Sequence, residues 1–226
     1  MVKTPHIAIF GGSFDPPHLG HQALVEAALA QLDVDALWIM PVGVPVHRQL
    51  SGKATAQQRL DWLKTMFAHD SRVHIKDWET KSSSPSPAIA TLRRFQDEHA
   101  DQTPTWLMGM DSYADLPNWV AYPEHQKRCN LLVFARQGCD KAELRAGWRL
   151  LEAGEGVIHM PSKAGNIAFL DIDLPLISSS QIRADVVQHQ TQLPQSTCNA
   201  ISVCYASALT DNTDEHIKQT NKERKA

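Results

Sequence analysis

The sequence predicts an α/β fold, with a doubly wound parallel sheet of five to six strands and flanking helices. Short apolar runs typical of buried strands recur along the chain, and stretches with helical periodicity separate most of them. This alternation favours parallel strands joined by crossover helices, as in Rossmann-like folds. The length of 226 residues, 42% of them hydrophobic, suffices for a core without disulfide or metal support.

The predicted strands are short runs rich in aliphatic and aromatic residues, and the first of them ends at a Gly-Gly pair. Such runs are typical of strands that are buried on both faces, as in parallel sheets. They span Ile7–Phe10, Ala36–Val42, Val73–Trp78, Thr105–Met110 and Asn130–Arg136, with two late, short candidates at Val157–Met160 and Ile167–Ile172.

The predicted helices lie between these runs. Thr55 and Gln58 have the spacing of a capping box, which places the start of one helix there. Serines and prolines predict a loop over Ser82–Pro87, and prolines mixed with aromatics predict short helical turns over Asp111–Gln126. The helices are expected over His18–Leu32, Thr55–Phe67, Ala88–His99 and Ser179–Gln188.

We expect a single domain over residues 1–209 and a disordered tail over residues 210–226. The composition shifts near Leu209, and the polar segment beyond it contains one large aliphatic residue, Ile217. A segment without an apolar face has nothing to pack against the domain.

The charge balance argues against partners that bind by bulk electrostatic attraction, such as nucleic acid or an anionic membrane. Lys and Arg total 22 and Asp and Glu 25, which gives a net charge of -3. The cysteines form no C-x-x-C pair, no apolar run matches a membrane helix, and the N-terminus does not resemble a signal peptide. The expected location is therefore the reducing cytoplasm, and a homo-oligomer stays open.

The segment from Gly11 to His21 has the composition of a phosphate-binding turn between a strand and a helix. Gly11 and Gly12 let a phosphate approach backbone N–H groups, and the helix start that follows favours anions. We place the next two residues, Ser13 and Phe14, among the phosphate-binding residues as well.

Two histidines occupy the start of the predicted helix. His18 and His21 are three residues apart and so share one face of the first turn, where both can donate to one phosphate. Gly20, between them, costs about 1 kcal/mol relative to alanine, which suggests that another group packs where a side chain would be.

Alternative roles for this segment are less favoured. Gly-Gly turns are common, and histidines in a first turn are usually surface residues. A zinc site at H-x-x-H lacks further ligands at metal spacing. The segment matches neither the dinucleotide fingerprint G-x-G-x-x-G nor the P-loop, which argues against a dehydrogenase-like binder.

A second segment, Ile177 to Arg183, opens the last predicted helix. The hydroxyls of Ser178, Ser179 and Ser180 can cap the helix or bind phosphate oxygens. Arg183 stands about one turn in, where its planar guanidinium can reach the same anion. A plain helix cap followed by a solvated arginine is the structural alternative.

Together, these segments resemble the nucleotidylyltransferase superfamily, whose H-x-G-H signature matches His18 to His21. The segment that ends in Ile182-Arg183 is similar to that of nicotinate and nicotinamide mononucleotide adenylyltransferases. From about residue 6 to about residue 190 the chain resembles the bacterial nicotinate mononucleotide enzymes.

The resemblance implies transfer of the adenylyl group of ATP to nicotinate mononucleotide by direct in-line displacement. The products would be deamido-NAD and pyrophosphate, in NAD biosynthesis. His18, His21 and Arg183 would be catalytic, on the transferring and leaving phosphates, and Ser178 to Ser180 would hold the triphosphate. Mg²⁺ would be bound through the ATP phosphates, with no metal site made by the protein.

The resemblance extends to residues outside the two segments. His47 and Arg48 would approach nucleotide phosphates, although an exposed basic pair is the alternative. Gly109 and Asp111, in a G-x-D-S segment, would lie at the adenosine and ribose, unless Asp111 only caps a helix. Trp119 would stack on the pyridine ring, unless it is a core tryptophan.

The chain departs from the family where the pyridine carboxylate is recognised. Ser86-Pro87-Ala88 stands for Ser-Tyr-Thr, and Val120 stands for the tyrosine after the stacking tryptophan. Ser86 stays a predicted nucleotide-binding residue, but Pro87 has no N–H to donate. Nicotinamide mononucleotide or another phosphorylated acceptor therefore stays open as substrate, as does a non-catalytic nucleotide sensor on the same fold.

Overall fold

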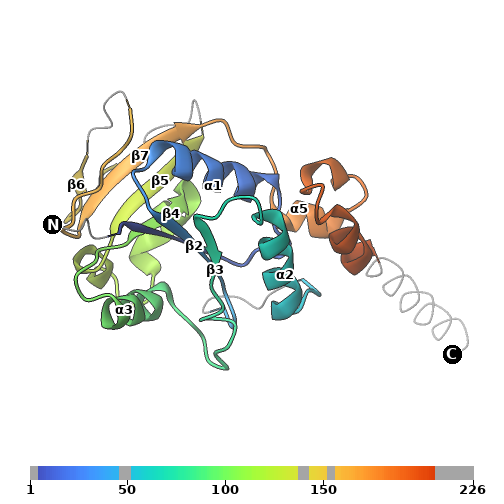
Figure 1. The fold of residues 1–226 in the computed structure, drawn as a ribbon, viewed down its shortest axis with the longest axis horizontal. Coiled ribbons are helices and arrows are strands. Elements are labelled where there is room, and N and C mark those ends of the chain that lie inside the picture. Colours follow the sequence, from blue (N-terminus) through green and yellow to red (C-terminus); the bar gives the residue numbers. More distant parts are fainter. Residues whose placement is uncertain (1–4, 46–51, 137–142, 152–155, 207–226) are drawn as a thin grey trace, which may run out of the picture.

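The computed structural model describes residues 5–45, 52–136, 143–151 and 156–206. It confirms the predicted α/β class, because every pair of adjacent strands is parallel and helices flank the sheet (Figure 1). The sheet has seven strands in the order β3-β2-β1-β4-β5-β7-β6, more than the expected five to six. The strands are β1 (Ile7–Gly12), β2 (Ala36–Pro41), β3 (Val73–Ile75), β4 (Thr105–Gly109), β5 (Asn130–Arg136), β6 (Arg149–Leu150) and β7 (Asn166–Ile172).

The additional strand is β6, which the sequence did not predict. Arg149 and Leu150 are exposed, so they carry no apolar pattern, and the pairing rests on backbone hydrogen bonds such as Arg149 N–H to Gly165 O at 2.9 Å. The predicted strand Val157–Met160 is wrong. Only Ile158 pairs, in an isolated bridge with Leu32 at the end of the first helix.

The α-helices lie at the predicted positions, most of them with shorter ends, whereas the last 3-10 helix and the helical residues 198–206 were not predicted. They are α1 (Leu19–Gln31), α2 (Ala56–Met66), α3 (Ala88–Glu98), α4 (Met110–Asp115) and α5 (Ser179–Ala184), with 3-10 helices η1 (Leu116–Asn118), η2 (Glu124–Lys127) and η3 (Gln190–Gln192). The predicted capping box at α2 is present: Gln58 N–H donates to Thr55 Oγ1, and Thr55 N–H donates to Gln58 Oε1 at 2.8 Å.

Two predicted elements are too long. The strand expected to reach Trp78 ends at Ile75, because the chain then turns, with Lys81 N–H bonded to Asp77 O. The last helix ends at Ala184 and not at Gln188. The chain turns there, and Val186 is buried in a cluster with the helical residues 198–206 and with α2. The predicted tail, residues 210–226, lies outside the described residues.

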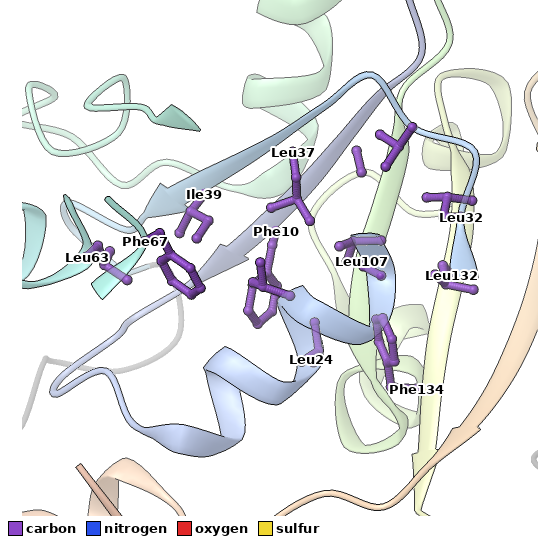
Figure 2. Packing of buried hydrophobic residues seen from close by; sticks show 14 of the residues in the cluster. Phe10, Leu24, Leu32, Leu37, Ile39, Leu63, Phe67, Leu107, Leu132 and Phe134 are labelled. Carbon is purple, nitrogen blue, oxygen red and sulfur yellow. The ribbon is translucent and has the colours of Figure 1, made fainter. Parts of the chain in front are cut away.

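Apolar clusters fill both faces of the sheet. Along β1, Ala8 and Phe10 face one cluster while Ile7 and Ile9 face the other, as the two-residue period of a strand requires. The first cluster lies under α1 and α2, and Figure 2 shows Phe10 packed near Leu24 of α1. The second lies under α3 and α4. Within the described ranges, no helix is long and apolar enough to cross a membrane.

The strand order reverses at the centre of the sheet. β1 pairs with β2 on one side and with β4 on the other. In an open α/β sheet, the connections after two such strands leave to opposite faces and open a crevice at the carboxyl ends of the strands. The segment after β1 is the predicted phosphate-binding turn, so the fold itself places it at this crevice.

Candidate active site

A pocket of about 420 Å³ opens at the carboxyl end of β1. The Gly11–Ser13 segment lies at one part of its wall, and aromatic side chains line another part. The lining residues are Gly11, Gly12, Ser13, Val42, Pro45, Glu79, Ser86, Pro87, Ala88, Trp106, Asp115, Trp119, Val120 and His125. The pocket therefore brings together predicted site residues from the first segment and from the ring region, namely Gly11, Gly12, Ser13, Ser86 and Trp119.

Gly11 and Gly12, the last two residues of β1, leave little room for a side chain. A Cβ on Gly11 would lie 2.8 Å from the Trp106 ring, and one on Gly12 would lie 3.1 Å from the Phe14 ring. Phe14 adopts a positive φ of 48°, which is uncommon for a non-glycine residue. It is fully buried and packs on His21 with ring centroids 4.9 Å apart. Phe14 thus packs beneath the loop against His21, and its phosphate contact stays a prediction.

His18 and His21 lie together at the start of α1. Their rings stack with centroids 3.8 Å apart at 28°. The His18 backbone N–H donates to Nδ1 of His21 at 3.2 Å, so the neutral His21 ring carries its proton on Nε2. The geometry thus leaves an Nε2–H donor on the second histidine.

Both histidines are neutral near pH 7. Burial lowers the pKa of His18 to about 4. Burial lowers the pKa of His21 well below its usual value, and the neighbouring His18 lowers it further. Each ring can therefore donate one hydrogen bond without bringing a positive charge.

The space beside Gly20 is occupied, as its position in the sequence suggested. A Cβ at Gly20 would lie 3.0 Å from Cε1 and Nδ1 of His18, closer than ordinary packing allows. The glycine therefore lets the His18 ring lie flat against the helix and reach its neighbour.

The second segment joins the first through hydrogen bonds that span more than 160 residues of sequence. The Ser179 hydroxyl donates to Pro16 O at 2.9 Å, and Arg183 donates through Nη1 to Asp15 O at 2.5 Å. Arg183 Nη2 also donates to Ser180 Oγ at 2.9 Å. The structure thus holds Arg183 beside the loop that precedes His18.

Ser178 has the capping role that was its structural alternative. It is the N-cap of α5, and its hydroxyl oxygen accepts from the Gln181 N–H at 3.3 Å. Ser178 and Ser180 are exposed, whereas Ser179 is partly buried. A phosphate contact by the two exposed hydroxyls stays a prediction.

A buried polar network under the loop was not predicted. Asp15 is 1% exposed and accepts a hydrogen bond from the Tyr205 hydroxyl, and both burial and this bond raise the pKa of Tyr205. Arg59 of α2 donates through Nη1 to Ser13 O and Val42 O, each at 2.8 Å. In the sequence, the acidic residue Asp15 between Phe14 and Pro16 was the available indication of this network. Its partners could not be identified because they come from distant segments.

The predicted adenosine residues, Gly109 and Asp111, do not line the pocket. Gly109 ends β4 and is the N-cap of α4, and Asp111 is exposed in the first turn of that helix. Asp111 therefore does not cap the helix itself. His47 and Arg48 lie outside the described residues.

The aromatic part of the pocket is built around two tryptophans. Trp119 is partly buried and meets Trp106 edge to face, with centroids 6.4 Å apart at 80°. Pro87 and Ala88, at the start of α3, and Val120 line the same pocket. The positions where the chain departs from the family pattern thus all line this pocket.

A buried carboxyl group, Glu79, also lines the pocket. It is 6% exposed and accepts a hydrogen bond from the Thr91 hydroxyl at 2.6 Å. Burial raises the pKa of Glu79 to about 7, although the Thr91 bond lowers it in part. The acid form is therefore favoured well above the ordinary range of a glutamate.

Glu79 is expected to make the stability of the protein depend on pH. Because its folded-state pKa is raised from 4.5 to about 7, the folded state loses stability as pH rises through this range, by about 3 kcal/mol in all. Glu79→Gln should abolish this loss and raise the free energy of unfolding at pH 8 by up to that amount. Urea unfolding at pH 5 and pH 8 tests this, with the exposed Glu26→Gln as control. An equal pH dependence in Glu79→Gln and wild type would contradict it.

In the described segments, no group of three or more His, Cys, Asp or Glu side chains is arranged to hold a metal ion. The rings of His18 and His21 stack on each other.

Comparison with known proteins identifies a family and relatives that match most of this chain. The sequence model of the cytidylyltransferase-like family matches residues 9–185. A probable nicotinate-nucleotide adenylyltransferase of Idiomarina loihiensis is 36% identical over 83% of this chain and 91% of its own length. One from Synechococcus sp. (strain JA-3-3Ab) is 31% identical over 80% of this chain and 82% of its own length.

Among solved structures, the nicotinic acid mononucleotide adenylyltransferase of Plasmodium falciparum complexed with NaAD is similar in fold. Its TM-score is 0.69 at 18% identity, covering 89% of this chain and 96% of that one. With the family match and the relatives above, the conclusion is that the chain belongs to the cytidylyltransferase-like family, in the group whose curated members are named nicotinate-nucleotide adenylyltransferases.

Proposed function

We propose that this protein transfers the adenylyl group of ATP to nicotinate mononucleotide, with deamido-NAD and pyrophosphate as products, in NAD biosynthesis. The observation that carries the proposal is the contact between two segments that are far apart in the sequence. Arg183 and Ser179 of the last helix bind the loop that leads into His18 and His21, beside a pocket lined by Trp119. The names of the curated relatives support the same reaction.

The chemistry needs no general base. The attacking group is the phosphate of the mononucleotide, which is already anionic, so catalysis consists of alignment and of stabilising the charge that builds up on the transferring and leaving phosphates. Neutral His18 and His21 suit this task as positioned N–H donors. Arg183 adds a fixed positive charge, and three of its five N–H groups are free of the two bonds that hold it.

The glycine loop and the serines complete the phosphate site in this proposal. Gly11, Gly12 and Ser13 offer backbone N–H groups next to the pocket, and Ser178 and Ser180 offer exposed hydroxyls at the start of α5. Gly109 and Asp111 are proposed at the adenosine, and Trp119 with Ser86 at the pyridine ring.

Magnesium enters as part of the substrate, MgATP. Mg²⁺ commonly binds through substrate phosphates and keeps several water ligands. It supplies neutralising charge on the phosphate oxygens. The protein's own contribution is the set of donors described above, and we place the reaction in the cytoplasm.

Nicotinamide mononucleotide is the second candidate acceptor. Pro87 and Val120, where the family pattern has other residues, both line the pocket that Trp119 also lines. Since Pro87 lacks an N–H, discrimination between a carboxylate and a carboxamide on the ring can be weaker here than in the family.

Pyrophosphate release from MgATP tests the proposal, with nicotinate mononucleotide, nicotinamide mononucleotide and phosphopantetheine assayed in parallel. We expect release with nicotinate mononucleotide at the highest kcat/KM. Release with phosphopantetheine alone would assign a different acceptor. ATP binding without release for any acceptor would instead support a nucleotide sensor and refute the enzymatic proposal.

A further inference from the structure

His125, in η2, is a buried histidine whose polar atoms lack partners. It is 2% exposed, and neither Nδ1 nor Nε2 has a hydrogen-bond partner in the part of the chain that the structure describes. Its ring contacts are aromatic: Trp119 at 5.7 Å and Tyr122 at 6.5 Å between centroids. A buried polar group left unsatisfied is costly, so such a group in a native protein calls for an explanation.

The explanation lies in the pocket, because His125 lines it together with Trp119. A ligand in this space therefore lies beside both the imidazole and the indole ring, and the covered imidazole nitrogens reach it when the His125 ring turns toward the pocket. Burial lowers the pKa of His125, and Arg93 lowers it further, against the opposing effect of Glu124. The neutral imidazole then presents one N–H donor and one acceptor.

The chemistry around His125 favours an anionic group. Ala88, the first residue of α3, lines the same pocket, and this eleven-residue helix has no side-chain cap at its start. First-turn N–H groups without a cap attract negative charge, and a histidine N–H adds a further donor. Two acids, Glu79 and Asp115, also line the pocket and oppose an anion. The pKa of Glu79, about 7, leaves much of it uncharged at neutral pH, and Asp115 accepts a hydrogen bond from Asn118 at 2.7 Å.

We infer that His125 is a specificity-determining residue, whose ring N–H donates to the carboxylate on the pyridine ring of the acceptor nucleotide while that ring lies against Trp119. This inference rests on the proposed function, and it adds a side-chain donor in the place where Pro87 offers no backbone N–H. It distinguishes nicotinate from nicotinamide, since a hydrogen bond to a charged acceptor is stronger than one to a neutral carboxamide.

The test compares kcat and KM for nicotinate mononucleotide and for nicotinamide mononucleotide at saturating MgATP. His125→Leu should raise the KM for nicotinate mononucleotide at least about tenfold, and that for nicotinamide mononucleotide by no more than about threefold. The kcat with nicotinate mononucleotide should stay within about twofold of wild type. His125→Gln, which keeps an N–H donor, should recover part of the loss.

His99→Leu is the matched control, because His99 packs against Phe95 and Trp38 and does not line the pocket. The ratio of kcat/KM between the two nucleotides does not depend on the fraction of folded enzyme, so it separates recognition from misfolding. An unchanged ratio in His125→Leu would overturn the inference and leave the proposed function standing. Failure of the wild type to use either nucleotide would overturn both.

Discussion

Replacement of His21 by alanine is expected to lower kcat at least about 100-fold, the usual loss for one positioned donor to a charged transition state. The His21 ring is fixed on three sides, by the His18 ring, by Phe14 and by the His18 N–H that binds its Nδ1. These contacts fix the ring and leave Nε2–H as its donor. Alanine removes the donor and leaves no side chain to replace it.

The loss should be catalytic and not structural. Alanine is a better helix former than histidine, and His21 lies in the first turn of α1, so secondary structure should be retained. Circular dichroism and the KM for ATP would verify this, with Gln22→Ala in the same turn as control. Near-wild-type turnover by a folded His21→Ala variant would contradict the assignment of His21.

Replacement of Arg183 is expected to have an effect of similar size. Arg183→Ala should lower kcat at least about 100-fold, because it removes the fixed positive charge beside the phosphate loop. Arg183→Lys should restore only a small part, since a lysine ammonium cannot hold Asp15 O and Ser180 Oγ and still present a planar pair of donors.

Steady-state kinetics of both Arg183 variants checks this prediction. Arg72→Lys is a suitable control, because Arg72 pairs with Asp70 at the surface and its replacement should leave kcat unchanged. If Arg183→Lys turned over like the wild type, the two bonds to Asp15 and Ser180 would not matter for catalysis. The fixed geometry proposed for the arginine would then be wrong.

The parts of the fold that depend on local sequence could be predicted. β1, the glycine loop and α1 follow each other directly, so an apolar run, a Gly-Gly pair and a helical pattern suffice to place them. The same holds for the capping box at Thr55. The close packing at Gly20 could also be predicted, because glycine destabilises a helix relative to alanine. The His18 ring occupies the space that a side chain at Gly20 would need.

The parts that depend on distant partners could not be predicted in the same way. β6 has exposed side chains and is held by backbone hydrogen bonds, so no apolar pattern marks it. The last helix is shortened because Val186 is buried against residues from α2 and from the chain near Tyr205. A hydrophobic pattern along one segment does not reveal which other segment will cover it.

The same division holds for the candidate site. His18, His21 and the serines before Arg183 lie in recognisable strings, so their residue types and spacing pointed to phosphate. Asp15, Glu79 and His125 are buried polar groups whose surroundings are assembled from separate elements. Their burial, the raised pKa of Glu79 and the unpaired nitrogens of His125 arise only in the folded chain, where low dielectric and missing partners change the chemistry of a side chain.

ATP labelled at its α-phosphorus tests the central claim most directly. Incubation with Mg²⁺ and nicotinate mononucleotide should transfer the label into a dinucleotide that carries nicotinate and adenosine, while unlabelled pyrophosphate is released. Label recovered in AMP alone would mean hydrolysis without transfer to the acceptor. Label left in ATP, in a protein that binds both nucleotides, would contradict the assignment of adenylyl transfer to this site.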